Sequence, residues 1–256
     1  MGNPGFANVY DDAARAAAYD TLEFPGTYYL AYRDLPGIIG DHVRGTRALD
    51  FGCGTGRSTR FLRRLGFDAV GVDVAAPMLA RARERDPSGD YRLVPDGDLA
   101  GLERSAYDLV LSAFTFDNVP TRAHKVALFR ALGDRLAVGG CIVNLVSAPE
   151  IYLHEWASFS TKAFPENRTA RSGDRVRIVM LDVPDARPVE DVVWSDEDYR
   201  AVYRDAGLAV LETYRPLAAA SEPYAWKSET TVSPWAIYLL AASAGGRRPV
   251  PSRPRA

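Results

Sequence analysis

The sequence is poor in the residues that mark metal sites, disulfide frameworks and membrane spans. It has 256 residues, with only two cysteines, Cys53 and Cys141, and three histidines. The cysteines lack a C-x-x-C spacing, so we expect reduced thiols packed in the interior and no metal. No run reaches the roughly 18 apolar residues of a membrane span, and the N-terminus lacks the basic and apolar segments of a signal peptide. We therefore predict a cytoplasmic protein without a membrane partner.

An excess of charge of either sign is also missing. The chain has 31 basic and 33 acidic residues, for a formal net charge of -2. Nothing attracts it as a whole to a polynucleotide, so we expect no nucleic-acid partner. An apolar content of 47% can bury one large core. Residues 1–256 are thus predicted to form a single domain, as a monomer or a homodimer, with a disordered tail at 243–256 that is rich in glycine, proline and arginine.

The most informative feature that is present is a glycine loop. Residues 48–56 read Ala-Leu-Asp-Phe-Gly-Cys-Gly-Thr-Gly, which predicts a strand, an acid at Asp50, and a turn where backbone closely approaches a ligand. The G-x-G-x-G spacing differs from the G-x-G-x-x-G of dinucleotide loops. A carboxylate before the first glycine would repel a pyrophosphate but attract an ammonium group. A second apolar run ends at Asp73, placed to accept hydrogen bonds from both hydroxyls of a ribose. Together the two acids predict a nucleoside with a cationic tail.

These motifs resemble those of the class I S-adenosylmethionine-dependent methyltransferases. Residues 50–56 match the glycine motif and 71–74 the next motif, while 95–99 are similar to the adenine-contacting loop and 107–113 to the fourth strand. The resemblance implies an α/β, Rossmann-like fold: a seven-stranded, mostly parallel sheet with the last strand antiparallel and helices on both faces. It also implies S-adenosyl-L-methionine as cofactor, S-adenosyl-L-homocysteine as product, and in-line methyl transfer to an oxygen or nitrogen atom, or to a carbon atom, of a small-molecule acceptor.

Alternating strand and helix patterns organise the chain around this core. We expect an N-terminal helical cap at 9–40, a cofactor-binding core at 41–147, a substrate-side insertion at 148–195 and the rest of the core at 196–242. Helix stops are expected at Gly66 and Gly139, and a helix capped by Ser195 is expected to end at Gly207. Strands are expected at 46–51, 69–73, 91–94, 108–113, 140–147, 208–214 and 234–241, helices at 57–65, 76–85 and 121–136, and a β-hairpin at 175–182 and 188–194.

The resemblance assigns cofactor contacts to the matching positions. Asp50 and the glycine loop would hold the methionine portion, and Asp73 would hold the ribose. The loop around Gly97 would contact the adenine amino edge. Ser112 would act through its backbone, and Arg33 or a cap tyrosine would meet the donor's carboxylate. Met78 and the cap tyrosines are open to a second interpretation as ordinary core. The complete set is Tyr28, Arg33, Asp50, Gly52, Cys53, Gly54, Gly56, Asp73, Val74, Met78, Asp96, Gly97, Asp98, Ser112 and Ala113.

The acceptor side is predicted from sheet topology, which brings the loops after the fourth and fifth strands to the same edge. His154 is the leading candidate base because imidazole titrates near neutrality, although a histidine on an amphipathic helix is often only packed or solvated. Glu155 and Asp117 are the other catalytic candidates. The expected substrate contacts are Phe116, Asn118, Tyr152, Trp156 and Arg175.

Other functions remain open at this point. A nucleoside-binding regulatory or inactive protein would keep the glycine loop but lack a closed acceptor pocket. A nicotinamide-dependent dehydrogenase is supported by the glycines alone, and Asp50 argues against it. A nucleic-acid methyltransferase is disfavoured by the near-neutral charge.

Overall fold

The structure is a computed structural model that describes residues 25–183 and 187–243. The expected tail and the first part of the predicted cap therefore lie outside the described residues. Within the described ranges, no helix is both long enough and apolar enough to cross a membrane.

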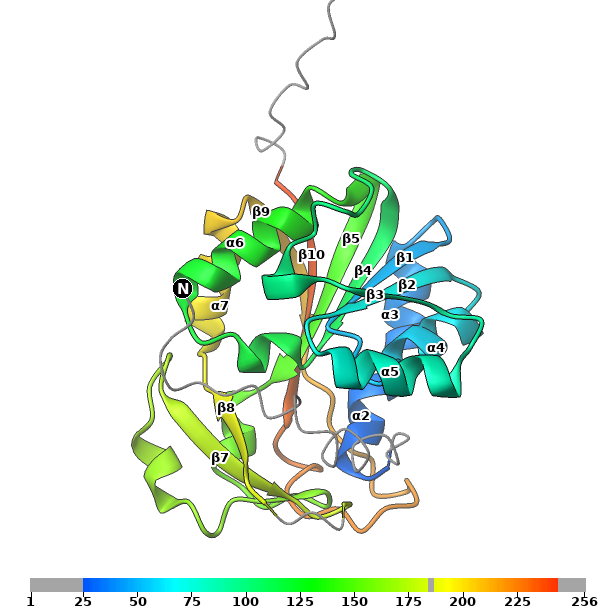
Figure 1. Cartoon of the computed structure of the whole chain (residues 1–256). Helices are drawn as coiled ribbons and strands as arrows, with labels where there is room; N and C mark the ends of the chain where they lie inside the picture. The colour runs from blue at the N-terminus through cyan, green and yellow to red at the C-terminus, as the bar shows by residue number, and fades with distance from the viewer. Residues whose placement is uncertain (1–24, 184–186, 244–256) are drawn as a thin grey trace, which may run out of the picture.

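A seven-stranded sheet forms the centre of the fold, in the order β3-β2-β1-β4-β5-β10-β9 (Figure 1). The pairings from β3 through β5 are parallel, whereas β10 runs antiparallel to both β5 and β9. This confirms the predicted Rossmann-like sheet. Its strands are β1 (Arg47–Phe51), β2 (Asp68–Asp73), β3 (Asp90–Leu93), β4 (Tyr107–Ala113), β5 (Leu136–Ser147), β9 (Leu208–Tyr214) and β10 (Trp235–Ala242).

Helices cover both faces of this sheet. Along β5, Val143 and Leu145 face the core under α2, α3 and α4, while Ile142 and Val146 face the core under α6 and α7. Because the central strands are buried on both faces, they read as continuous apolar runs. The helices are α2 (Thr27–Arg33), α3 (Leu35–His42), α4 (Arg57–Arg64), α5 (Ala76–Arg85), α6 (Arg122–Gly133) and α7 (Asp196–Asp205).

Most helix ends follow the sequence signals. The Ser195 hydroxyl accepts a hydrogen bond from the Asp198 amide at 3.1 Å, which caps α7, and Gly207 follows that helix with a φ of 80°. The prediction for Gly139 is wrong. Helix α6 already ends at Gly133, and β5 begins at Leu136, so Gly139 lies inside a strand.

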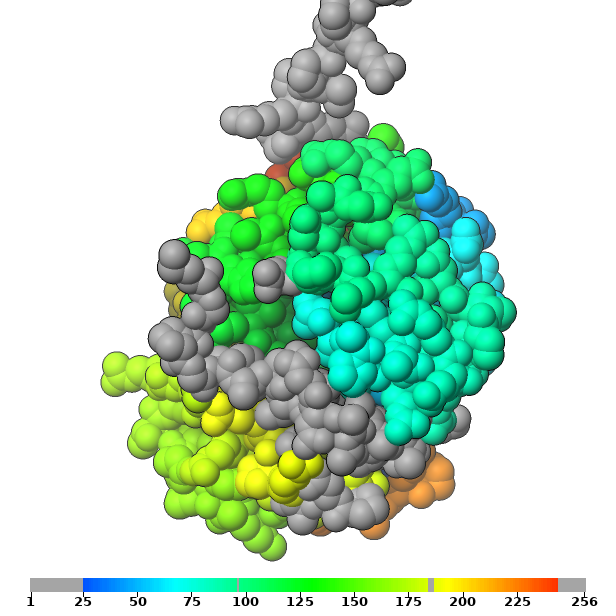
Figure 2. Space-filling model, in the orientation of Figure 1, coloured from blue at the N-terminus to red at the C-terminus, as the bar shows by residue number. Residues whose placement is uncertain are grey.

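The insertion forms a second, three-stranded antiparallel sheet in the order β6-β7-β8. Strands β7 (Arg175–Met180) and β8 (Val189–Val192) confirm the predicted hairpin, whereas β6 (Phe159–Ser160) was not expected because two residues carry no alternation. On the face shown in Figure 2, the insertion (yellow-green to yellow) lies below the green and cyan residues that belong to the main sheet and its helices. Short 3-10 turns link these parts: η2 (Pro95–Gly97), η3 (Thr115–Asn118), η4 (Pro149–Tyr152) and η5 (Pro165–Thr169).

Candidate active site

The glycine loop joins β1 to α4, and all three of its alternate glycines have positive φ. The angles are 76° at Gly52, 54° at Gly54 and 79° at Gly56. A Cβ at Gly52 would lie 2.0 Å from the Thr115 hydroxyl, and one at Gly56 would lie 2.6 Å from the Tyr91 hydroxyl. At Gly54 the closest atom would be the Met78 methyl at 3.2 Å. Packing within the protein thus explains Gly52 and Gly56, whereas a Cβ at Gly54 would make a tight contact with the flexible end of the Met78 side chain.

Asp73, at the end of β2, ties this loop to the next helix. Its Oδ2 accepts a hydrogen bond from the Gly54 amide and its Oδ1 one from the Ala75 amide, both at 2.8 Å. A carboxylate has about four acceptor positions, so these bonds leave capacity for ribose hydroxyls. Asp73 therefore both orders the loop and fits a nucleoside.

Asp50 lies beneath the loop and is fully buried. Its Oδ2 accepts hydrogen bonds from the hydroxyls of Ser58 and Thr59, both at 2.6 Å. Its Oδ1 has no hydrogen-bond partner among the described residues. Burial raises the pKa of Asp50 to about 6, against the effect of the two hydroxyls. A buried carboxylate oxygen in this position fits a ligand that brings a cationic group.

The expected adenine side has one open apolar wall. The Val74 side chain is 47% exposed, while Met78 is buried beside Gly54. In the acidic loop, which includes Asp96, the Gly97 amide donates to the Val94 carbonyl at 3.0 Å, and the Asp98 carboxylate accepts from the Ala100 amide at 2.8 Å. The Gly97 amide and the Asp98 carboxylate thus already hold the turn.

Three other expected cofactor contacts lie at the loop or at the end of β4. Cys53 is buried in a cluster with Leu79 and Tyr91, so its side chain packs in the protein. Ser112 is fully buried, and Ala113 follows it at the end of β4. The side chains of Cys53 and Ser112 are thus both buried within the protein. The expectation that Cys53 and Cys141 are packed in the interior is confirmed.

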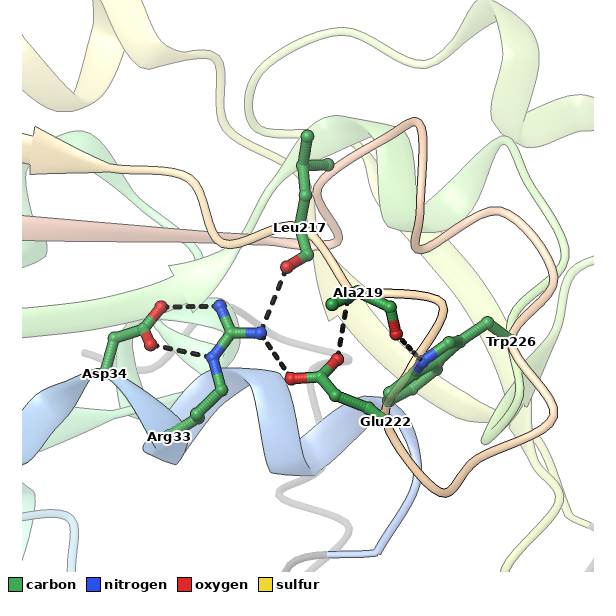
Figure 3. A network of polar contacts seen from close by, with 6 residues as sticks. All are labelled: Arg33, Asp34, Leu217, Ala219, Glu222 and Trp226. Atoms are coloured by element: carbon green, nitrogen blue, oxygen red, sulfur yellow. Dashed lines mark hydrogen bonds and ion pairs between the residues drawn. The ribbon is translucent and has the colours of Figure 1, made fainter.

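Arg33 is engaged elsewhere than predicted. Figure 3 shows its guanidinium between Asp34 and Glu222, with Nε–Oδ1 and Nη1–Oε1 distances of 2.7 Å, and Nη1 also donates to the Leu217 carbonyl at 3.1 Å. These contacts tie α2 to the segment between β9 and β10. They leave Arg33 in a structural role, which does not support the expected pairing with the donor's carboxylate.

Sequence reasoning missed a different arginine next to the loop. Arg57 directly follows Gly56, and its guanidinium lies 5.1 Å from the centroid of the Tyr28 ring and 5.7 Å from that of Tyr32. Its position immediately after the glycine motif was the signal that could have identified it. Tyr28 itself is buried, as expected for either of its two interpretations.

A pocket that is partly open to solvent lies where the carboxyl end of the main sheet meets the insertion. Its walls come from α2, η3 and the residue before it, η4, the ends of β5 and β10, and strands β6, β7 and β8. The residues that line it are Tyr28, Phe114, Asp117, Asn118, Ser147, Ile151, Tyr152, Phe159, Ile178, Met180, Val189, Asp191 and Trp235.

Two carboxylates line this pocket. Asp117 is buried and accepts hydrogen bonds from the Ser147 amide, at 3.1 and 3.3 Å to its two oxygens. Burial raises the pKa of Asp117, and the amide of Ser147 and the charge of Lys125 oppose that shift. Asp191, on β8, accepts a hydrogen bond from the Tyr152 hydroxyl at 3.0 Å. The sequence prediction had found Asp117 but not Asp191, although Asp191 alternates with Val189 on the buried face of its strand.

A buried lysine stands behind these acids. Lys125 is fully buried on α6, and its ammonium group donates to the Phe116 carbonyl and lies 3.5 Å from the Tyr199 hydroxyl. Its nitrogen is 5.0 Å from the centroid of the Trp194 ring. Burial lowers the pKa of Lys125, while Asp117 and Asp191 raise it. The signal was a lysine on the same helix face as buried Leu128 and Phe129.

Three residues predicted to contact the acceptor lie outside the lining of this pocket. Phe116 is fully buried and stacks on Phe129 with a centroid distance of 3.9 Å. Trp156 is also fully buried, and its indole donates to the Ile151 carbonyl at 2.7 Å. Arg175 pairs with Glu190 at 3.1 Å on the hairpin. None of these three residues lines the pocket. Their large or charged side chains are used for packing and for a surface ion pair, whereas Asn118 and Tyr152 line the pocket as expected.

The other two catalytic candidates also lie away from the pocket lining. His154 follows the 3-10 turn η4 and lies outside any helix, and its ring meets the Trp156 ring edge-on with a centroid distance of 5.9 Å. The Glu155 carboxylate accepts from the Ser160 hydroxyl at 2.9 Å and the Thr161 amide at 2.7 Å, which closes a loop. Of the three candidates, Asp117 is the one that the structure places in the pocket.

Known proteins share both the sequence motif and the fold. A family model described as "Methyltransferase domain" matches residues 49–142. Cypemycin N-terminal methyltransferase from Streptomyces sp is 28% identical over 242 residues, covering 86% of this chain and 94% of that protein. Ubiquinone biosynthesis O-methyltransferase from Burkholderia thailandensis is 34% identical over 90 residues, covering 34% of this chain and 39% of that protein.

Solved structures extend the likeness over most of the fold. The CcbJ methyltransferase from Streptomyces caelestis superposes with a TM-score of 0.63 at 18% identity, covering 92% of this chain and 98% of that one. DesVI from Streptomyces venezuelae does so with a TM-score of 0.59 at 17% identity, covering 91% and 99%. The sheet order, the glycine loop with its two acids and these relatives agree. Together, the matched domain and these relatives support a class I S-adenosylmethionine-dependent methyltransferase.

Proposed function

We propose that this enzyme methylates a small-molecule acceptor held in the pocket between the main sheet and the insertion. The observation that carries the proposal is the contact between the two sites. Thr115 starts η3 and donates its hydroxyl hydrogen to the Phe51 carbonyl at 2.9 Å, directly at the glycine loop. The same turn contributes Asp117 and Asn118 to the pocket. A donor at the loop and an acceptor in the pocket would therefore be neighbours.

On the donor side, each part of S-adenosylmethionine has residues of suitable chemistry. Asp73 suits the ribose, and Val74 with Met78 an adenine face. Asp50 suits the amino group, and Arg57 beside Tyr28 replaces Arg33 as our choice for the carboxylate. The cofactor supplies a methyl group already activated on a sulfonium, so the protein needs no covalent intermediate.

On the acceptor side, the chain has to orient the nucleophile, exclude water and receive its proton. Asp117 is the carboxylate placed to receive a proton, because it is buried, raised in pKa and part of the pocket wall. Asn118 and the Tyr152 hydroxyl can orient the acceptor. The names of the relatives include both an N-terminal methyltransferase and an O-methyltransferase, so the family alone leaves the atom open.

Two measurements test this function. Calorimetric titration should show binding of S-adenosylmethionine, and mass spectrometry should show S-adenosylhomocysteine forming with at least one member of a panel of amines, phenols and carboxylates. Asp117→Asn should then lower turnover with that acceptor by about 100-fold, in the range of a lost general base, without changing cofactor affinity. Cofactor binding without turnover across the panel would favour a nucleoside-binding regulatory protein instead.

We also propose that the enzyme acts in the cytoplasm, as a monomer or a homodimer. Both cysteines are free and buried, which supports a compartment that keeps thiols reduced. Sedimentation in the ultracentrifuge tests the oligomeric state.

A further inference from the structure

We infer that the group methylated in this pocket is an amine, which binds as its ammonium ion beside Asp117 and between aromatic rings. The inference rests on the proposed function and narrows its acceptor to one class. The inference is argued from the acidic and aromatic residues that line the pocket, from the position of Lys125, and from the burial of Asp117.

The lining has acidic groups and no basic group among its described residues. Asp117 comes from η3 and Asp191 from β8, so two unrelated elements each place a carboxylate in the same wall. Carboxylate or phosphate acceptors would meet like charge here, in a site where burial weakens solvent screening. A cationic acceptor meets the opposite charge.

Aromatic rings form much of the remaining wall. The Tyr28 ring lies 5.1 Å from Phe159 and 5.9 Å from Trp235, and Phe114 lies 4.8 Å from Trp235, all between centroids. The faces of such rings attract ammonium groups, and this attraction persists when methyl groups replace the N–H hydrogens. The rings therefore suit both the substrate amine and its methylated product.

Lys125 favours the ionised form of Asp117 without entering the pocket. Its ammonium group is held on the far side by the Phe116 carbonyl, the Tyr199 hydroxyl and the Trp194 ring, and it is not part of the lining. Within residues 25–183 and 187–243, the charged or titratable groups that act on Asp117 and Lys125 include each other and Asp191, with Tyr152 and Tyr199 alongside. Asp117 can then receive a proton that an ammonium group gives up.

The transfer balances with this arrangement. One N–H bond of the ammonium breaks and its proton passes to Asp117, which leaves the lone pair on nitrogen. That lone pair forms the new N–C bond as the bond between the methyl carbon and sulfur breaks, and the electron pair of the broken bond stays on sulfur. No oxidant, reductant or further reactant is consumed.

The test measures the binding affinities of three matched probes, and it does not depend on turnover. Benzylamine, benzyl alcohol and benzoate are titrated by calorimetry into the full chain with S-adenosylhomocysteine present. We expect benzylamine to bind at least about tenfold more tightly than benzyl alcohol, and benzoate to bind more weakly than either, as one close ion pair in a buried site requires.

Neighbouring residues on β8 supply the matched variants. Asp191→Asn removes a pocket charge, whereas Glu190→Gln removes the same charge one residue away, where it pairs with Arg175 on the hairpin. Asp191→Asn should weaken benzylamine about tenfold or more and leave benzyl alcohol unchanged, and Glu190→Gln should change neither. Thermal unfolding checks that both variants fold, and the comparison of probes on the unaltered chain needs no variant.

Two results would overturn the inference: benzyl alcohol or benzoate binding as tightly as benzylamine, or benzylamine affinity that does not respond to Asp191→Asn in a folded protein. Other results would refute the proposed function or distinguish it from this inference. Methyl transfer to hydroxyl compounds but not to amines refutes the amine while the methylation of small molecules stands. Absence of S-adenosylhomocysteine binding refutes the donor site, and the preference between the probes can still be measured without it.

Discussion

Replacing Glu229 by glutamine should destabilise the protein strongly, because this carboxylate joins three distant segments. Glu229 is fully buried between β9 and β10. Its Oε1 accepts hydrogen bonds from the Thr27 hydroxyl and the Ala157 amide, and its Oε2 one from the Lys227 amide. The first two distances are 2.7 Å and the third is 2.8 Å.

The magnitude follows from these bonds. A hydrogen bond to a charged group contributes about 1.5–3 kcal/mol, and a neutral one about 1 kcal/mol. The side-chain carbonyl of the introduced glutamine can still accept from Thr27 and Ala157, but with neutral strength, and its NH₂ group faces the Lys227 amide donor. We therefore expect Glu229→Gln to lower the free energy of unfolding by about 3 kcal/mol, roughly a hundredfold in the folding equilibrium.

Urea unfolding followed by circular dichroism measures this change. Glu222→Gln is the matched control in the same segment, since Glu222 pairs with Arg33 nearer the surface and should lose about 0.5–1 kcal/mol. Tryptophan fluorescence adds a local readout, because the Trp235 indole donates to the Thr27 carbonyl at 2.8 Å. A loss for Glu229→Gln no larger than that of the control would refute this reasoning.

Three further predictions concern the donor site. Gly54→Ala should cost about 1 kcal/mol of stability through its positive φ and reduce S-adenosylhomocysteine affinity about tenfold or more by calorimetry. Gly66→Ala, at a φ of 92° with nothing near its Cβ, should cost similar stability and leave affinity unchanged; equal affinities would contradict a ligand beside Gly54. Asp50, with a pKa of about 6, must be ionised to meet an ammonium group, so affinity should rise with pH up to about 6 and then level off, and Asp50→Asn should remove this dependence. Asp73→Asn should weaken binding about tenfold or more, and unchanged affinity in a folded variant would exclude Asp73 from the ribose.

The secondary structure around the glycine loop could be predicted because the sequence signals for it lie close together in the chain. Strand β1, the loop, α4, β2 and α5 follow one another between Arg47 and Arg85, and each motif is read within a few residues of its neighbours. Alternation and glycine positions then determine the elements. Even here the sequence does not show that Asp50 lies beneath the loop with one oxygen bound to Ser58 and Thr59, since spacing does not tell what a side chain at the end of a strand contacts.

The acceptor pocket could not be read in the same way, because its walls come from segments far apart in the chain. His154 and Trp156 looked suitable as residue types, yet one follows a 3-10 turn and the other is core. Lys125, Asp191 and Glu229 look like ordinary surface charges until the fold buries them. Their meaning depends on long-range contacts, which single-sequence periodicity does not contain.

The position of β10 sets the order in which this protein can be made. Residues 235–242 pair with β5 on one side and β9 on the other, and among the described strands β9 pairs with β10 alone. During synthesis, β1 to β5 can emerge and pair, but the sheet remains open until the last residue of β10 has left the ribosome. Trp235 and the segment that holds Tyr28 in place arrive at the same late stage. The segments from β1 to α5 can thus form early on a nascent chain, whereas the pocket is complete only once β10 has been translated.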